Sequence, residues 1–276
     1  MSQAYQNGKY CPESDIRISP RDIGLLRSYA VFDVMPVYRG RPFHADRHYA
    51  RLRRSAETLG LRVPITGEEF ATVAAELVCQ AGPREVSIRS VLTGGPSQSG
   101  FRPESGQENF FMLVDPIHAP RPAMYRDGVS LVTLEYTRSL PQVKFANHAI
   151  AIQDLARRDV AGAYETLYVN QGVVSECSQS NLFWVRDGQV CTTWDNALRG
   201  ITQGLVMELA LVQGKTVAKK SVTLEELLQA DEVFITGSSK ALVPVVEIDN
   251  RKIGSGTVGP ITRELMVAYR EYCVKY

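Results

Sequence analysis

The stretch GVVSECSQSNLFWV, residues 172–185, places an acidic side chain inside a run of apolar residues. Its valines, phenylalanine and tryptophan are typical of β-strands, but Glu176 interrupts the pattern between two apolar runs. A carboxylate buried between strands costs free energy unless a cation meets it. The stretch therefore predicts a positively charged partner for Glu176, and the nature of that partner bears on both fold and function.

The residues on either side of this stretch alternate between strand and helix patterns. Residues 45–59 repeat apolar side chains at helical spacing, with Asp46 as the expected N-cap and Gly60 after the last turn. Thr202 is the expected N-cap of a later helix that ends at Gly214. Strands are predicted at residues 29–38, 85–94, 109–117, 129–137 and 231–239, with a run of strands at 165–193 and further helices at 66–80, 221–230 and 259–276.

The segment 118–128 separates two mixed halves of the chain. It holds two prolines and shows neither a helical nor a strand period, so we expect a linker there. This divides the chain into a smaller N-terminal α/β domain over residues 1–117 and a larger C-terminal domain over residues 129–276.

The charge balance argues against two classes of partner. The chain of 276 residues carries 31 Lys and Arg against 30 Asp and Glu, which gives no support for a nucleic-acid or membrane-surface role. It has no apolar run long enough to span a bilayer, and its first residues lack the apolar core of a secretory signal. With 44% apolar residues, the chain can bury a sizeable core.

The five cysteines are odd in number and scattered, and they form no CxxC pair. Neither cysteines nor histidines show metal-ligand spacing, so no metal site is expected. Reduced thiols are the simplest interpretation, and they favour a cytoplasmic protein.

A cofactor with a protonated ring nitrogen would supply the cation that Glu176 requires. Pyridoxal 5′-phosphate has such a nitrogen, and it also needs a lysine for its aldehyde and a set of phosphate donors. Lys144 stands between the apolar residues Val143 and Phe145, where partial burial would free its amine to attack a carbonyl. Taken alone, a lysine in such a mixed segment is more often exposed.

Three features could hold the phosphate. The helix that starts near Thr202 offers free N–H groups and the positive end of its dipole. The residues TGSS, 236–239, end a strand with a glycine and small hydroxyls, which lets an anion approach the backbone. Arg51 follows His48 by one helical turn. Each also has an ordinary alternative: an N-cap, a simple turn and a solvated helix face.

Five further motifs carry a resemblance when they are taken with the opening stretch. They are VFDVMPVYRGRPFHADRHYARLRRSAETLGL (31–61), VKFANHAIAI (143–152), LRGITQGLVMELA (198–210), ADEVFITGSS (230–239) and PVVEIDNRKIGSGTVGPIT (244–262). Over residues 20–270 the chain resembles the class IV aminotransferases, the fold-type IV group of pyridoxal-phosphate enzymes. The resemblance implies an α+β protein with two α/β domains and the cofactor between them.

The resemblance implies a role for each matching residue. Lys144 matches the Schiff-base lysine of the family, and Glu176 matches the acid that bonds the pyridine nitrogen, which would answer the question of its cation. The remaining matches bind the phosphate or lie beside the cofactor and the substrate carboxylate. The phosphate-binding matches are Arg51, Ile201, Thr202 and Ser238, and the flanking matches are Gly237 and Ser239.

The sequence departs from the family pattern at several places, including Phe32, which stands where some D-amino acid transaminases have tyrosine. Gln203 replaces an arginine that often follows the GIT motif, for which we expect a local packing change with cofactor binding kept. Residues 93–100 lack the arginine-containing traps that hold the substrate carboxylate in better-known members. Arg27 and Arg89 are the candidates to replace them, although each could equally form a structural ion pair.

The activity implied by the resemblance is transamination between an amino acid and a 2-keto acid by a ping-pong mechanism, in a homodimer with a shared active site. The donor could be a D-amino acid or a branched-chain L-amino acid. One alternative is an aminodeoxychorismate lyase of the same fold, and another is a cofactor-binding protein without turnover.

Overall fold

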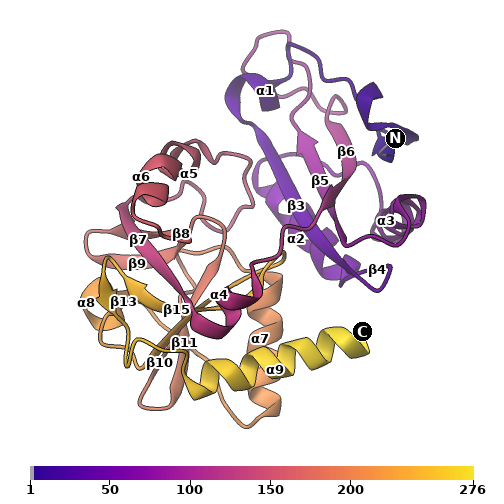
Figure 1. Ribbon diagram of the computed structural model, residues 1–276. Coiled ribbons are helices and arrows are strands. Elements are labelled where there is room, and N and C mark those ends of the chain that lie inside the picture. The colour runs from indigo at the N-terminus through magenta and orange to yellow at the C-terminus, as the bar shows by residue number, and fades with distance from the viewer. Residues whose placement is uncertain (1–2) are drawn as a thin grey trace. The chain divides into compact units, whose positions relative to one another are not determined.

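The structure of the protein is a computed structural model that describes residues 3–276. The chain forms two compact units (Figure 1). The first contains the chain up to His118 together with Val143–Asn147 and Tyr276. The second contains Ala119–Gln142 and His148–Lys275. Each unit has its own sheet and its own apolar core, so each is described by itself.

The first unit contains a six-stranded sheet in the order β2-β1-β6-β5-β3-β4, paired antiparallel throughout. The helices α2 and α3 pack on this sheet and on each other. The elements are β1 (Gln3–Gln6), β2 (Lys9–Pro12), η1 (Glu13–Asp15), α1 (Ile23–Arg27), β3 (Ala30–Tyr38), β4 (Arg41–Pro42), α2 (Ala45–Thr58), α3 (Gly67–Ala81), β5 (Val86–Thr93) and β6 (Asn109–Pro116).

Local signals explain where the two long helices of this unit begin. The Thr66 side chain accepts from the Glu69 N–H while the Glu69 side chain accepts from the Thr66 N–H, so a capping box starts α3. The prediction of Asp46 as the N-cap of α2 is wrong. His44 takes that position in the left-handed conformation (φ 49°), and Asp46 falls in the first turn, where its charge favours the helix dipole.

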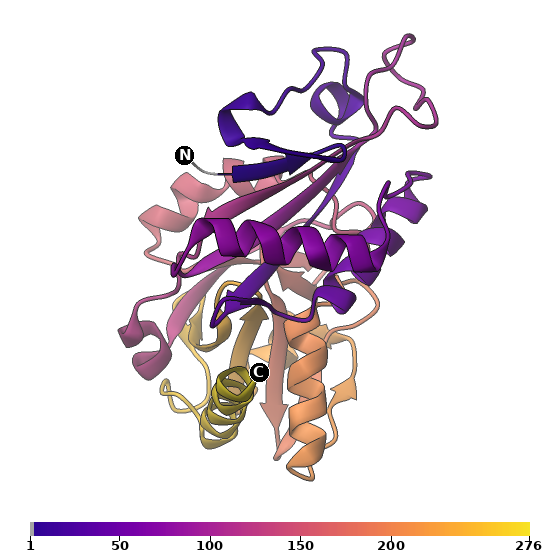
Figure 2. The same ribbon diagram turned by 90° about the vertical axis from the view of Figure 1, so that its right-hand side faces the viewer.

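The second unit contains a ten-stranded mixed sheet in the order β12-β11-β10-β14-β15-β7-β8-β9-β13, with β16 paired to β15. The helices α7 and α9 lie side by side, as the orange and yellow helices of Figure 2 show. The elements are α4 (Pro122–Asp127), β7 (Val129–Glu135), α5 (Ala149–Gln153), α6 (Leu155–Val160), β8 (Glu165–Asn170), β9 (Val173–Cys177), β10 (Asn181–Arg186), β11 (Gln189–Thr192), α7 (Ile201–Val212), β12 (Ala218–Lys219), β13 (Val222–Thr223), α8 (Leu224–Leu227), β14 (Glu232–Gly237), β15 (Ala241–Ile248), β16 (Arg251–Lys252) and α9 (Pro260–Lys275).

The stretch 172–185 forms β9, a turn at 178–180 and β10. The predicted strands and helices around it are present with shifts of a few residues at their ends. The unexpected features include the hairpin of β1 and β2 and the short helix α4 within 118–128. The sequence of residues 138–162 favours a single helix in its second half, whereas the structure has two short helices there, α5 and α6.

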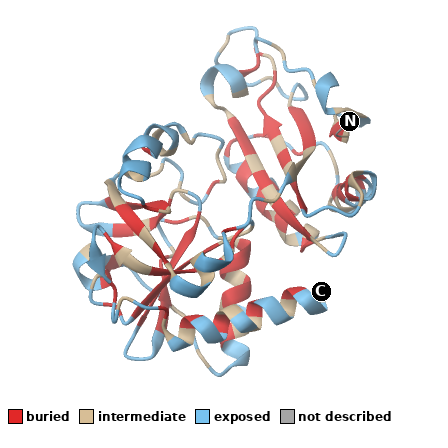
Figure 3. Cartoon of the chain, viewed as in Figure 1, coloured by how far each residue is buried: buried red, intermediate tan, exposed pale blue. Residues whose placement is uncertain are grey.

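Burial follows the two sheets, whose central strands are largely buried while the turns and outer helix faces are exposed (Figure 3). In the first unit, Leu52, Phe70 and Leu77 from the helices meet Ile88 and Phe110 of the sheet in one apolar cluster. Burial of such side chains is the main favourable term in folding, at about 1.5–3 kcal/mol each. Among residues 3–276, no helix is both long and apolar enough to span a bilayer.

Candidate active site

Lys144 is fixed at the edge of the first unit's sheet by its own backbone. The Phe32 N–H donates a hydrogen bond to the Lys144 carbonyl (3.0 Å), and the Lys144 N–H donates to Oγ of Ser55 on α2 (3.1 Å). Phe145 forms a β-bridge with Val31. The Lys144 Nζ atom lies 4.6 Å from the centre of the Phe32 ring. Lys144 is thus a partly buried residue on a fixed backbone, and its binding of a carbonyl stays a prediction.

Arg51 lies on α2 and is only 4% exposed, so the alternative of a solvated helix face is wrong. Asp33 on β3 accepts two hydrogen bonds from its guanidinium, at 2.7 Å from Nε and 2.8 Å from Nη2. The same carboxylate lies 2.6 Å from Nδ1 of His48, which is also fully buried. Sequence analysis missed Asp33, although a carboxylate inside the apolar run of residues 29–38 is a signal of the same kind as Glu176.

The charges of this cluster follow from its contacts. Burial acts to raise the pKa of Asp33, but Arg51 and His48 outweigh it and hold that pKa far below its ordinary value. Burial also lowers the pKa of His48, so the neutral ring donates its Nδ1–H to Asp33. Two Arg51 nitrogens are then fixed by Asp33. Its third nitrogen, Nη1, has no hydrogen-bond partner among the described residues, which leaves it available to an anion.

Glu176 is buried on β9 in the second unit, and both of its oxygens have partners. Oε1 accepts from Nη1 of Arg138 at 2.5 Å, and Oε2 accepts from the Leu198 N–H at 3.0 Å. Arg138 is a cation that sequence analysis missed, because it precedes Glu176 by 38 residues and no local pattern marks it. A carboxylate has about four acceptor positions, so a ring N–H can be a further donor to Glu176.

The start of α7 is joined to Glu176 through the segment that ends at Gly200. The Asn181 amide donates to the Leu198 carbonyl at 2.5 Å, so Asn181 holds the local backbone. A Cβ atom at Gly200 would lie 2.0 Å from Oδ1 of Asn181, which explains the glycine. Gly200 is the N-cap, and the prediction of Thr202 as the cap is wrong by two residues. Ile201 and Thr202 instead occupy the first turn, whose N–H groups lack intrahelical partners.

Gln203 is held by several hydrogen bonds at this helix start. Its side-chain oxygen accepts from the Gly200 N–H at 3.1 Å, and its amide donates to Oγ1 of Thr192 at 2.9 Å and to the Thr193 carbonyl at 3.1 Å. The residue is 1% exposed. A neutral, fully bonded glutamine therefore braces α7 against β11 at the position where the family often has arginine.

The turn Gly237–Ser239 lies beside the turn that follows Glu176. Strand pairing places Asn181 opposite Thr236, and a Cβ atom at Gly237 would lie 3.4 Å from the Gln179 carbonyl. The second unit thus brings together Glu176, the start of α7 and the turn that contains Ser238. These are the segments that the family resemblance assigns to the ring nitrogen and the phosphate.

The two arginines proposed for the substrate carboxylate both belong to the first unit. Arg27 ends α1, is exposed, and donates to the Leu26 carbonyl. Arg89 on β5 forms an ion pair with Asp115, at 2.6 Å from Nε to Oδ2, with 41% of its side chain exposed. The structural ion pair that was the alternative for Arg89 is therefore present, and the carboxylate role of both residues stays a prediction.

The comparisons with known proteins point to aminotransferases. The family model for amino-transferase class IV matches residues 30–248. A Methanocaldococcus jannaschii protein named as a branched-chain-amino-acid aminotransferase is 33% identical over 99% of this chain and 96% of its own. A D-alanine aminotransferase of Bacillus licheniformis is 30% identical over 95% of this chain and 94% of its own. A branched-chain amino acid aminotransferase from T.th., solved with pyridoxamine 5′-phosphate, superimposes with a TM-score of 0.90 at 28% identity, covering 99% of this chain and 94% of its own.

The chain belongs to the class IV aminotransferase family. It is therefore a pyridoxal-phosphate-dependent aminotransferase of fold type IV, with amino acids and 2-keto acids as its substrates. The residues present fit that cofactor. Nη1 of Arg51 and the first-turn N–H groups of α7 are donors suited to a phosphate, and Glu176 is a buried acceptor suited to a ring N–H. Among the described residues, no cluster of side chains is suited to a metal ion.

Proposed function

We propose that this enzyme transfers the amino group of a branched-chain L-amino acid or a D-amino acid to a 2-keto acid by a ping-pong mechanism. The observation that carries the proposal is the grouping of Glu176, the α7 start and the turn Gly237–Ser239 in one unit. The relatives support both donor classes, since one is named for branched-chain amino acids and the other for D-alanine.

Each site residue has a distinct task in this proposal. Lys144 binds the aldehyde carbon of the cofactor and, once released, moves a proton from the α-carbon of the donor as general base and then as general acid. When bound, the cofactor supplies an electron sink for the carbanion at that carbon. Glu176 binds the ring nitrogen and keeps it protonated. The phosphate is bound by Arg51, Ile201, Thr202 and Ser238, with Gly237 and Ser239 beside the cofactor and the substrate carboxylate.

The fixed backbone of Lys144 suits this task. Its carbonyl and N–H are bonded to Phe32 and Ser55, so only the side chain needs to move between the cofactor and the substrate. The apolar ring of Phe32 beside the amine limits the water around it. In a ping-pong cycle the first product leaves before the acceptor binds, so the same lysine serves both half-reactions in opposite directions.

One experiment tests the reaction and the donor class together. The purified enzyme is mixed with each member of a matched panel of D- and L-amino acids without acceptor, and the visible absorbance of the bound cofactor is followed. A transaminase loses this absorbance with its true donors and regains it when a 2-keto acid is added. Initial rates at varied donor and acceptor concentrations should give parallel double-reciprocal lines, as ping-pong kinetics require.

Two other outcomes would reject the proposal. Release of pyruvate from aminodeoxychorismate, with no spectral change from any amino acid, would show the lyase of the same fold. Cofactor binding with no response to the whole panel and to aminodeoxychorismate would show a binding protein without turnover.

We further propose a cytoplasmic homodimer with a shared active site. All five cysteines are free thiols, which suits a reducing compartment. Sedimentation of the purified protein measures its mass against the 30.6 kDa of one chain. Mixing two inactive variants, each altered at a different site residue, should restore part of the activity only if subunits share a site.

A further inference from the structure

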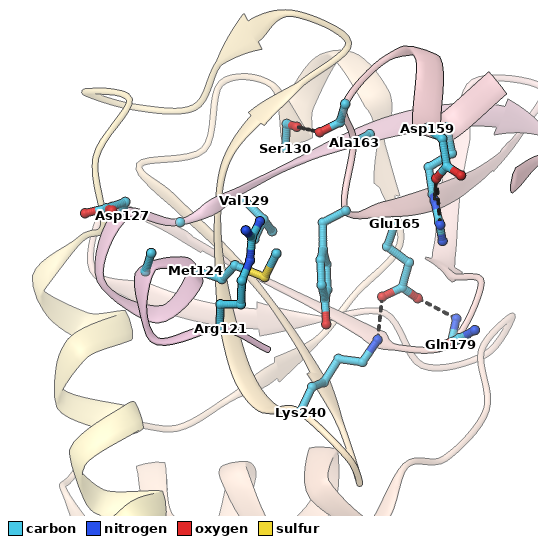
Figure 4. Close-up of a pocket in the computed structure, with 15 residues that line it drawn as sticks. Arg121, Met124, Asp127, Val129, Ser130, Asp159, Ala163, Glu165, Gln179 and Lys240 are labelled. Atoms are coloured by element: carbon cyan, nitrogen blue, oxygen red, sulfur yellow. Dashed lines mark hydrogen bonds and ion pairs between the residues drawn. The ribbon is translucent and has the colours of Figure 1, made fainter. Parts of the chain in front are cut away.

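A buried ion pair lies next to the proposed phosphate turn and has no part in the mechanism described so far. Nζ of Lys240 is 2.8 Å from Oε2 of Glu165, and their side chains are 7% and 3% exposed. The pair lies at a pocket of about 750 Å³ in the second unit, whose lining includes Tyr164. Figure 4 shows Glu165 between Lys240 and Gln179 at this pocket. Burial lowers the pKa of Lys240, but Glu165 and Tyr164 raise it more, so the amine stays charged.

The Glu165 carboxylate also holds the turn between β9 and β10. Its Oε1 accepts from the Gln179 N–H at 2.5 Å and from Oγ of Ser178 at 3.3 Å. Its Oε2 accepts from Oγ of Ser180 at 2.8 Å. All three residues of the turn that follows Glu176 and Cys177 are therefore bonded to one carboxylate on the neighbouring strand β8.

Lys240 closes the other turn. Its N–H donates to the Gly237 carbonyl at 3.2 Å, and its own carbonyl accepts from the Tyr125 hydroxyl at 2.9 Å. Ser238 and Ser239 lie between these two anchored ends. The ion pair to Glu165 thus connects the turn 237–240 to the turn 178–180 across the pairing of β10 with β14.

Buried ion pairs are a poor source of stability, because the cost of removing two charges from water offsets most of their attraction. What such a pair does provide is a defined geometry, since both charges require their partner at hydrogen-bond distance. The two turns joined here are short and rich in serine and glycine, so their own sequences restrict them little.

We propose that Glu165 and Lys240 are positioning residues that set the place of the Ser238 turn relative to Glu176, and so align the phosphate contact with the ring contact of the cofactor. The proposal rests on the proposed roles of Ser238 and Glu176. Glu176 has anchors of its own in Arg138 and the Leu198 N–H. Breaking the pair should therefore loosen the phosphate end of the site and leave the ring end in place.

The test compares two ligands that differ only in the phosphate. Dissociation constants for pyridoxal 5′-phosphate and for pyridoxal are measured by absorbance titration, and the melting temperature of the cofactor-free protein is measured alongside. Lys240→Met should weaken pyridoxal 5′-phosphate at least tenfold and pyridoxal by less than threefold. The matched control is Lys215→Met, which breaks the more exposed Lys215–Glu264 pair of the same unit and should change neither constant.

A second variant keeps the test decisive if an unpaired Glu165 prevents folding. The double variant Glu165→Gln/Lys240→Met removes both charges, so it should melt close to the wild type while keeping the selective loss of phosphate affinity. Equal losses for the two ligands, or no loss in the double variant, would show a merely structural pair and overturn the proposal. Failure of the proposed function is recognised separately by the amino-acid panel on the wild-type protein, because a lyase or a binding protein without turnover would still prefer the phosphorylated cofactor.

Discussion

Asp33→Asn tests whether the buried carboxylate on β3 is what allows Arg51 to lie inside the first unit. The substitution keeps the size of the side chain but removes the charge that two Arg51 nitrogens and His48 contact. Breaking a buried pair by removing one partner costs about 3–5 kcal/mol, because the other charge remains buried and unpaired. A change of this size lowers the melting temperature of a chain this long by about 6–20 °C.

The assay is thermal unfolding of cofactor-free protein followed by circular dichroism at pH 7. Asp115→Asn is the matched control, since it breaks the Asp115–Arg89 pair in the same unit, where the side chains are 29% and 41% exposed. Such a surface pair contributes about 0–1 kcal/mol. An Asp33→Asn protein that melts no lower than Asp115→Asn would refute the reasoning.

The pH dependence gives a second check on Asp33. Its folded pKa lies below the ordinary value of 3.8, so its stabilisation is fully present above that value and is lost as the pH falls below it. The difference in melting temperature between the wild type and Asp33→Asn should therefore be constant from neutral pH down to about pH 5 and shrink at lower pH. A difference that grows on acidification would contradict the assignment of the charge.

Four further substitutions test the site directly. Lys144→Ala should fold, because both backbone bonds of that residue remain, but should lose nearly all turnover and the borohydride-reducible link to the cofactor; a reducible adduct in this variant would point to another lysine. Glu176→Gln should bind the cofactor and slow the half-reaction by about tenfold or more, the effect of a lost charged hydrogen bond of about 1.5–3 kcal/mol, and an unchanged stopped-flow rate would remove it from the mechanism. Arg27→Lys or Arg89→Lys should raise the donor KM by about tenfold if that guanidinium grips the carboxylate, with cofactor affinity unaltered; if neither variant changes KM or kcat, the carboxylate is bound elsewhere.

The features that sequence analysis predicted are those with a local physical cause. The helix that starts at Thr66, the strands of residues 165–193 and the cost of burying Glu176 each depend on residues close together in the chain. The family pattern then supplied the order of the motifs. Two helices have other N-caps than the sequence predicts. His44 caps α2 in a left-handed backbone conformation, and Gly200 caps α7 where a side chain would clash with Asn181. Local sequence reveals neither of these causes.

The features that sequence analysis missed depend on distant pairs. Arg138 meets Glu176 and Lys240 meets Glu165 only after the sheet has formed, and these partners lie 38 and 75 residues apart. The need of Asp33 for a partner could be predicted, because a buried charge within an apolar strand requires one. That this partner is Arg51 depends on the packing of α2 on β3, which the sequence does not show. Sequence can therefore show that a buried charge needs a partner well before it can show which one.

The placement of residues 143–147 in the first unit has a consequence for how the chain is made. These residues pair with Ala30 and Phe32 along β3, yet the segments before and after them belong to the second unit. A nascent chain that has emerged only to His118 leaves that part of β3 as an open edge, which is prone to pair with other chains. The first unit therefore cannot finish folding while the ribosome is still making the start of the second. A fragment cut at His118 should aggregate, even though almost all of that unit's sequence would be present.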